Sequence, residues 1–203
     1  MPDINNSQNN DLDRKVDGRP IRICTFDIET TALEAGHGYM LCACVKEVNR
    51  NNFAGRTHTF RIDDYADGRK SFSDKEMIKD LVKCLDSYDL VLTWYGSRFD
   101  IPFTNTRALK WGIKTLDKNF RRDLCLCARG FGKLRNNRLA TWDKYLHGGK
   151  TDKTFLDFDV WIQAMRGDKK SLQYIVTHCE ADVLVTEKVY KKVMPLLGKL
   201  RKN

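Results

Sequence analysis

Two hydrophobic patterns alternate along the chain. Short apolar runs, typical of buried strands, cover residues 21–26, 38–48, 57–62, 90–95 and 123–127. Apolar residues at three- and four-residue spacing predict helices over 73–88 and 100–111, helical segments from residue 139 onward, and a long helix over 170–193 that ends shortly before Pro195. Because strands and helices alternate, we expect an α/β sheet.

The helix predicted over 73–88 carries a signature for its first turn. Ser73 is followed three residues later by Glu76, which matches a capping box. Glu76 also belongs to a closely spaced acidic pair with Asp74. The capping interpretation assigns that pair to helix structure rather than to chemistry.

The two ends of the chain differ from its middle. The first 18 residues are rich in Asn and Asp, so we expect a disordered tail at 1–18, and a basic C-terminal tail is expected at 199–203. The 203 residues are 41% apolar, which is enough for one substantial core, and no repeat or composition break divides them. Residues 19–198 are therefore expected to form a single domain.

Composition argues against a membrane or secreted protein. No run approaches the roughly 18 to 20 apolar residues of a membrane span, and the first 20 residues lack the apolar segment of a secretory signal. An odd number of cysteines, seven, favours reduced thiols, and the Cys-x-Cys pairs at 42/44 and 125/127 are too closely spaced for a typical structural zinc site. We expect a cytoplasmic protein with no membrane partner.

The net charge of +9 is concentrated in one segment. Residues 105–153 hold 13 Lys and Arg against 4 Asp and Glu, whereas the remainder holds 23 of each sign. Basic surface of this kind is typical of proteins that bind nucleic-acid phosphates, and a solvated charged face is the alternative. The side chains suited to guiding a single strand are Arg121, Arg122, Arg129, Phe131, Lys133, Arg135, Arg138, Trp142 and Lys150.

Three acidic motifs carry the candidate chemistry. Asp27 and Glu29 extend the first apolar run, where the two-residue period of a strand turns both carboxylates to one face. Asp100 begins a predicted helix, and His178 precedes Asp182 by one helical turn. Each motif alone also has a structural interpretation, as surface charge, a helix cap or a solvated pair. Carboxylates on one face repel unless a cation lies between them, which favours a divalent-metal site.

The order and setting of the segments FDIETT, FDIPF and HCEAD resemble the DnaQ-like (DEDD) 3′-5′ exonucleases. The similarity is greatest to the proofreading exonuclease domain of B-family DNA polymerases and its stand-alone relatives, and it covers roughly residues 21–197. The resemblance implies a ribonuclease H-like mixed β-sheet flanked by α-helices. It also implies hydrolysis of single-stranded DNA from the 3′ end, in a setting of DNA replication or DNA repair.

The same resemblance implies roles for individual residues. Two divalent ions, Mg²⁺ or Mn²⁺, would be held by Asp27, Glu29, Asp100 and Asp182. His178 is the candidate general base. It lies four residues before Asp182, the spacing at which one branch of the family has tyrosine, and Tyr174 is a candidate for orienting it. The residues implied to contact the terminal nucleotide are Thr30, Thr31, Leu33, Phe99, Phe103 and Arg107, of which the two phenylalanines also fit a helical core.

Two other functions fit the same residues. An exoribonuclease would use the same carboxylates, because discrimination against RNA depends on how the site treats the 2′-OH. A non-catalytic nucleic-acid-binding module would keep the fold, but the presence of all four carboxylates favours an enzyme. The expected partner is thus single-stranded nucleic acid, with DNA favoured over RNA.

Overall fold

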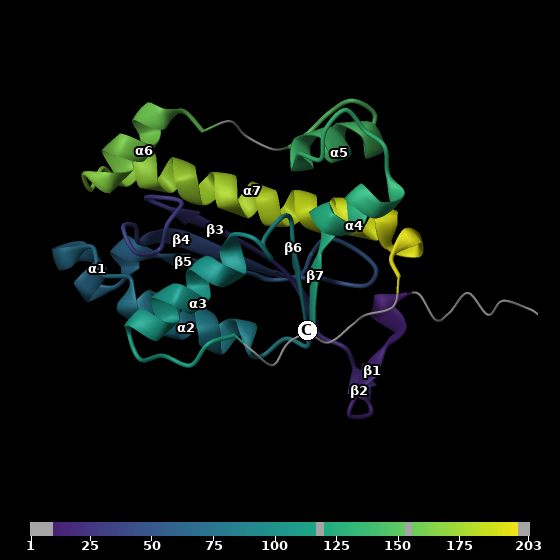
Figure 1. Cartoon of the computed structure of the whole chain (residues 1–203), viewed down its shortest axis with the longest axis horizontal. Coiled ribbons are helices and arrows are strands. Elements are labelled where there is room, and N and C mark those ends of the chain that lie inside the picture. Colours follow the sequence, from purple (N-terminus) through teal and green to yellow (C-terminus); the bar gives the residue numbers. More distant parts are fainter. Residues whose placement is uncertain (1–9, 117–119, 153–155, 199–203) are drawn as a thin grey trace, which may run out of the picture.

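A mixed five-stranded sheet lies at the centre of the structure (Figure 1). The computed structural model describes residues 10–116, 120–152 and 156–198. In spatial order the strands are β5 (Thr57–Arg61), β4 (Met40–Glu47), β3 (Ile23–Thr30), β6 (Leu90–Thr93) and β7 (Phe120–Asp123). Strand β3 is antiparallel to β4 and parallel to β6, and β6 is parallel to β7. The central position of β3 places its end among several neighbouring segments.

Helices cover both faces of this sheet. They are α1 (Ala66–Ser71), α2 (Lys75–Leu85), α3 (Asp100–Lys110), α4 (Leu124–Phe131), α5 (Leu139–Leu146), α6 (Phe158–Met165) and α7 (Lys169–Val193). Figure 1 shows α7 across one face and α2 and α3 on the other. Helix α7 packs on β3 and β4, and α5 and α6 pack on α7. The predicted α/β architecture, a mixed sheet flanked by helices in a single domain, is confirmed.

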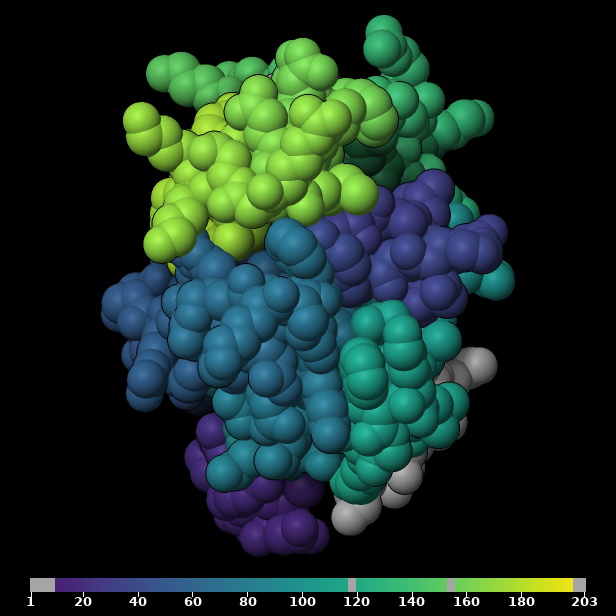
Figure 2. Space-filling model, turned by 90° about the vertical axis from the view of Figure 1, so that its left-hand side faces the viewer, coloured from purple at the N-terminus to yellow at the C-terminus, as the bar shows by residue number. Residues whose placement is uncertain are grey.

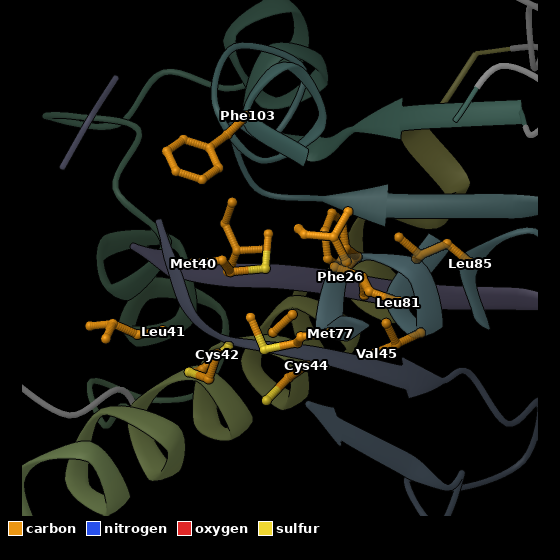
Figure 3. Packing of buried hydrophobic residues seen from close by; sticks show 14 of the residues in the cluster. Phe26, Met40, Leu41, Cys42, Cys44, Val45, Met77, Leu81, Leu85 and Phe103 are labelled. Atoms are coloured by element: carbon orange, nitrogen blue, oxygen red, sulfur yellow. The ribbon is translucent and has the colours of Figure 1, made fainter. Parts of the chain in front are cut away.

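The central strands are apolar on both faces because helices cover both. Residues Met40–Val45 of β4 are all buried, and so is Phe26 of β3. Met77 and Leu81 of α2 pack in the same cluster (Figure 3). No helix in the described part of the chain combines the length and apolar composition needed to cross a bilayer.

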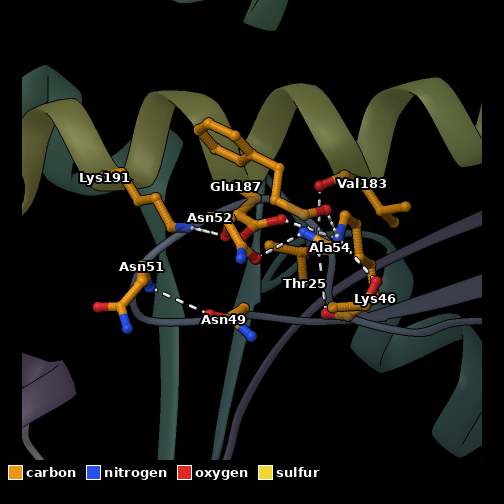
Figure 4. A network of polar contacts seen from close by, with 11 residues as sticks. Thr25, Lys46, Asn49, Asn51, Asn52, Ala54, Val183, Glu187 and Lys191 are labelled. Atoms are coloured by element: carbon orange, nitrogen blue, oxygen red, sulfur yellow. Dashed lines mark hydrogen bonds and ion pairs between the residues drawn. The ribbon is translucent and has the colours of Figure 1, made fainter.

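Buried polar contacts hold α7 on the sheet (Figure 4). Lys46 of β4 lies with Nζ 3.0 Å from Oε2 of Glu187, and both side chains are buried. Thr25 of β3 donates a hydrogen bond from Oγ1 to the Val183 carbonyl at 2.9 Å. A buried ion pair of this kind loses much stability when one partner is removed, because the other charge is left uncompensated. These contacts therefore determine which face of α7 is turned to β3.

The sequence predicts a strand at 123–127, and this prediction is wrong, because most of the segment is the start of a helix. Strand β7 ends at Asp123, and α4 begins at Leu124. The Asp123 carboxylate accepts hydrogen bonds from the backbone N–H groups of Cys125 and Leu126, at 3.0 and 3.2 Å. A short apolar run does not distinguish strand from buried helix, and here the N-terminal cap favours the helix.

The predicted capping box at Ser73 and Glu76 is also wrong. Helix α2 begins at Lys75, and Glu76 instead pairs with Lys79 at 3.3 Å. Asp74, the residue before the helix, is fully buried and binds the Arg107 guanidinium through both carboxylate oxygens, at 2.7 and 2.8 Å. This long-range ion pair replaces the expected local cap.

Part of the expected N-terminal tail is structured. Residues 10–18 include the short helix η2 (Asp11–Asp13) and strand β1 (Lys15–Val16), which pairs with β2 (Arg19–Pro20). Asp11 is fully buried and lies 3.1 Å from the Arg122 Nε. The expectation of disorder is therefore wrong for 10–18, while residues 1–9 and the expected basic tail at 199–203 lie outside the described residues.

Candidate active site

Strand β3 and helix α7 bring the first and last acidic motifs together. Asp27 and Glu29 share one face of β3, and the buried Ile28 between them faces the other way. Helix α7 packs on the strand at this point, since the Cys179 Sγ lies 3.4 Å from the Asp27 carbonyl oxygen. The residues on either side of Cys179 in α7 are thereby directed to the carboxylates.

The imidazole of His178 lies between two carboxylates. Its Nε2 is 3.7 Å from Asp182 Oδ2 and 3.8 Å from Glu29 Oε1. His178 and Asp182 are both buried, and Glu29 is partly buried. The structure thus places three residues that the sequence singled out, from segments about 150 positions apart, within ion-pair distance of one another.

Asp100, the first residue of α3, completes the acidic group. Its Oδ1 accepts a hydrogen bond from the backbone N–H of Ile28 at 3.0 Å, which ties it to β3 between the first two carboxylates. The side chain is only 4% exposed. Burial raises its pKa to about 7, backbone hydrogen bonds oppose the rise, and the negative charges of Asp123 and Asp182 add to it. Asp100 thus experiences the charge of the other carboxylates.

The donor atoms of these residues fit a hard divalent cation. Mg²⁺ and Mn²⁺ prefer carboxylate oxygens, and four carboxylates that repel one another are stabilised when a cation neutralises them. The raised pKa of Asp100 reports burial and this repulsion. Within the described residues, no group of three or more His, Cys, Asp or Glu side chains is already arranged to hold a metal ion. Asp27, Glu29, Asp100 and Asp182 are the residues that would hold such an ion.

The segment that follows β3 lines a cavity of about 470 Å³ beside Glu29. Four of the residues implied to contact a terminal nucleotide lie in its wall: Thr30, Thr31, Leu33 and Phe99. Leu33 is 84% exposed, so its side chain is accessible to a ligand in this cavity. The structure thus brings these four residues together next to the carboxylates.

The opposite wall of this cavity comes from α6, which sequence reasoning missed. Phe158, Trp161, Ile162 and Met165 line it, and Phe158 is 73% exposed. Figure 2 shows α6 against the segment that follows β3. The signal in the sequence was the large share of apolar residues in FDVWIQAM. A helix of eight residues that packs on one neighbour needs fewer apolar residues than this.

Phe103 and Arg107 do not reach this cavity. Phe103 is buried in the core, with its ring 5.7 Å from that of Phe99. The guanidinium of Arg107 is held by Asp74 and donates to the Ala35 carbonyl at 3.1 Å. Both residues lie on the inward faces of α3, where they support the fold around the cavity.

The basic segment divides between buried and exposed positions. Arg122 is buried against Asp11, and Trp142 is buried with Trp94 and Phe131 around it. Arg129 and Arg138 are exposed and line a second cavity, of about 890 Å³, together with Asp27 and Asp182. Of the basic side chains that the sequence suggested for binding a single strand, Arg129 and Arg138 therefore lie in the same cavity as two of the carboxylates.

Comparison with known proteins agrees with the observed fold. A family model described as the RNase H superfamily matches residues 24–194. Among solved structures, the family B DNA polymerase from the hyperthermophilic archaeon Pyrobaculum calidifontis is similar at a TM-score of 0.66 and 19% identity, over 90% of this chain and 26% of that one. The chain thus spans about a quarter of the polymerase, and the likeness concerns the fold alone. No curated protein matches the sequence. Because the family model covers all four carboxylates and the structure has the corresponding sheet and helices, the chain belongs to the RNase H superfamily and has its RNase H-like, DnaQ-like fold.

Proposed function

We propose that this protein is a metal-dependent 3′-5′ exonuclease that hydrolyses the last phosphodiester bond of single-stranded DNA by a two-metal-ion mechanism. The observation that carries the proposal is that Asp27, Glu29, Asp100 and Asp182 come from three separate segments to the end of β3, where Glu29 also lines an apolar cavity large enough for one nucleoside. Membership of the RNase H superfamily supports its broader part, a nuclease-type hydrolase that binds nucleic acid.

The four carboxylates, Asp27, Glu29, Asp100 and Asp182, would hold the metal ions. When bound, divalent ions stabilise charge on the leaving 3′ oxygen and favour deprotonation of the attacking water. His178 is the proposed general base, because imidazole accepts a proton near neutral pH and its Nε2 lies within 4 Å of two of the carboxylates. Because His178 lies one turn before Asp182 in α7, its ring would face a phosphate bound at the carboxylates.

The cavity beside Glu29 supports action on a chain end. Its volume of about 470 Å³ suits one nucleoside, and α6 bounds one side of it. Thr30 and Thr31 would contact the sugar, while the exposed Leu33 is placed to wedge beside a base. A terminal nucleotide held there would present the phosphodiester on its 5′ side to the carboxylates, which gives 3′-5′ polarity.

The test is degradation of matched single-stranded DNA and RNA oligomers labelled at the 5′ end, with Mg²⁺, Mn²⁺ or EDTA. We expect stepwise shortening from the 3′ end of the DNA, abolished by EDTA and by Asp27→Ala. Asp67→Ala, which removes an exposed carboxylate on α1, is the matched control and should leave activity unchanged. Faster loss of RNA would indicate an exoribonuclease, and no metal-dependent shortening of either polymer would leave a binding module as the better account.

A further inference from the structure

Three of the candidate carboxylates line two different cavities. Glu29 lines the smaller one, which holds the proposed terminal nucleotide, whereas Asp27 and Asp182 line the larger one of about 890 Å³. The two cavities share no lining residue. A substrate whose scissile bond lies at the carboxylates therefore extends into the larger cavity on one side of that bond.

The two cavities differ in charge. Apart from Glu29, the residues that line the smaller cavity are uncharged, whereas Arg129, Arg138 and Lys144 line the larger one and are all exposed. When a strand is cut at its last phosphodiester, the released nucleotide carries only the scissile phosphate. Every other phosphate belongs to the strand upstream, and these are the groups that cations beside the site attract.

The loop that presents Arg138 is held in place. Trp94 donates from Nε1 to the Asn137 carbonyl at 3.0 Å, and Trp142 donates from Nε1 to the Asn137 Oδ1 at 3.2 Å. The Arg138 N–H donates to the Asn136 Oδ1 at 3.0 Å. A cation on a fixed backbone loses less conformational entropy on binding than one on a mobile loop, so this arrangement suits ligand binding.

Tyr95 adds an aromatic surface to the same cavity. Its φ of +70° is strained for a residue with a side chain, and its backbone N–H is held by Asp123 Oδ1 at 2.9 Å. The ring is 44% exposed, and the Arg129 guanidinium carbon lies 5.4 Å from its centre. An exposed ring beside an arginine is the combination on which single-stranded bases stack.

We propose that Tyr95, Arg129, Arg138 and Lys144 form a binding subsite for the nucleotides upstream of the scissile bond. The arginines and the lysine bind phosphates, and Tyr95 stacks with a base. The proposal rests on the exonuclease function proposed above. The subsite contributes affinity for the strand and leaves the chemical step to the carboxylates.

Two substrates separate the subsite from the chemistry. A single-stranded oligonucleotide carries phosphates upstream of its scissile bond. The p-nitrophenyl ester of thymidine 5′-phosphate carries only the scissile phosphate, and its p-nitrophenyl group takes the place of the upstream strand as the leaving group. For the double variant Arg129→Ala/Arg138→Ala we expect KM for the oligonucleotide to rise about tenfold, and the salt dependence of log KM to weaken by about 1.4, or about 0.7 per lost phosphate contact. Its kcat/KM for the ester should stay within about twofold of the wild-type value, since the ester makes neither phosphate contact.

A second pair of exposed cations provides the matched control. Arg56→Ala/Lys83→Ala removes the same charge from positions outside the cavity. It should change neither KM for the oligonucleotide nor kcat/KM for the ester. Tyr95→Ala, which removes the stacking ring, should raise the oligonucleotide KM about fivefold. These outcomes support the subsite.

Two results overturn the subsite. One is an equal loss on both substrates, which would indicate a general defect. The other is a change on the oligonucleotide no larger than that of the Arg56/Lys83 control. Failure of the wild-type protein to hydrolyse either substrate with Mg²⁺ or Mn²⁺ would instead refute the exonuclease function, and the subsite with it.

Discussion

Asp100 is expected to reduce the stability of the metal-free protein at neutral pH and above. Its pKa is raised from 3.8 to about 7 in the folded chain, chiefly because the carboxyl is buried. As pH rises from about 3.8, the unfolded chain releases this proton first, so folding stability falls until about pH 7 and is then constant. A shift of about 3 units at about 1.4 kcal/mol each gives an upper value of about 4 kcal/mol.

The substitution Asp100→Asn removes this cost without changing the shape of the side chain. Asparagine keeps the oxygen that accepts from the Ile28 N–H, and it carries no charge at any pH. With EDTA present, we expect the variant to exceed the wild type in unfolding free energy by about 1 kcal/mol at pH 4.5 and by up to about 4 kcal/mol at pH 8. The same variant should lose the proposed nuclease activity, because it removes one of the four carboxylates proposed to bind the metal ions.

Urea unfolding followed by tryptophan fluorescence from pH 4.5 to 8 measures this difference. Asp67→Asn, an exposed carboxylate in the first turn of α1, is the control and should show a small difference that does not grow with pH. A stability difference for Asp100→Asn that stays constant across this range would refute the reasoning. So would a variant less stable than the wild type at pH 8, because the buried charge would then already be compensated in the fold.

Three further outcomes follow from the structure. Lys46→Met removes the buried cation 3.0 Å from Glu187, which keeps Lys191 at 2.9 Å, and should lower the unfolding free energy in urea by about 3 kcal/mol, whereas Lys79→Met on the surface should change it by less than about 1 kcal/mol. His178→Gln should lower kcat at least about 100-fold with little change in oligonucleotide binding, because a general base acts on the chemical step; a change confined to KM would contradict that role. Phe158→Ser should raise KM for the p-nitrophenyl ester and the oligonucleotide alike, since it lies in the terminal-nucleotide cavity, and an unchanged ester KM would exclude that placement.

The sequence by itself determined most of the central elements and the positions of the candidate residues within them. Apolar periodicity located β3, β4, β5, β6 and the long helix α7, because side-chain spacing records which positions face a core. The two-residue period of β3 also required Asp27 and Glu29 to share a face. Helical spacing likewise placed His178 and Asp182 one turn apart.

Local patterns were insufficient where a distant residue competed for a group. Ser73 and Glu76 match a capping box that would begin a helix at Ser73. In the structure α2 begins after Asp74, and Asp74 is bound by Arg107, 33 positions away. The alternating residues at 123–127 suit a strand, but the Asp123 carboxylate caps a helix there. Arg107 itself could be assigned to substrate from its sequence position, because nothing local reveals its buried partner.

Only the tertiary structure decided which surfaces meet at the site. Periodicity shows that α7 has a buried face, but the contacts of Lys46 and Thr25 determine that this face lies over the end of β3. The α6 wall and the cations of the larger cavity depend in the same way on segments far apart in the chain. A cavity is bounded jointly by several elements, so no single stretch of sequence contains it, and the sequence could name the carboxylates but not the surfaces around them.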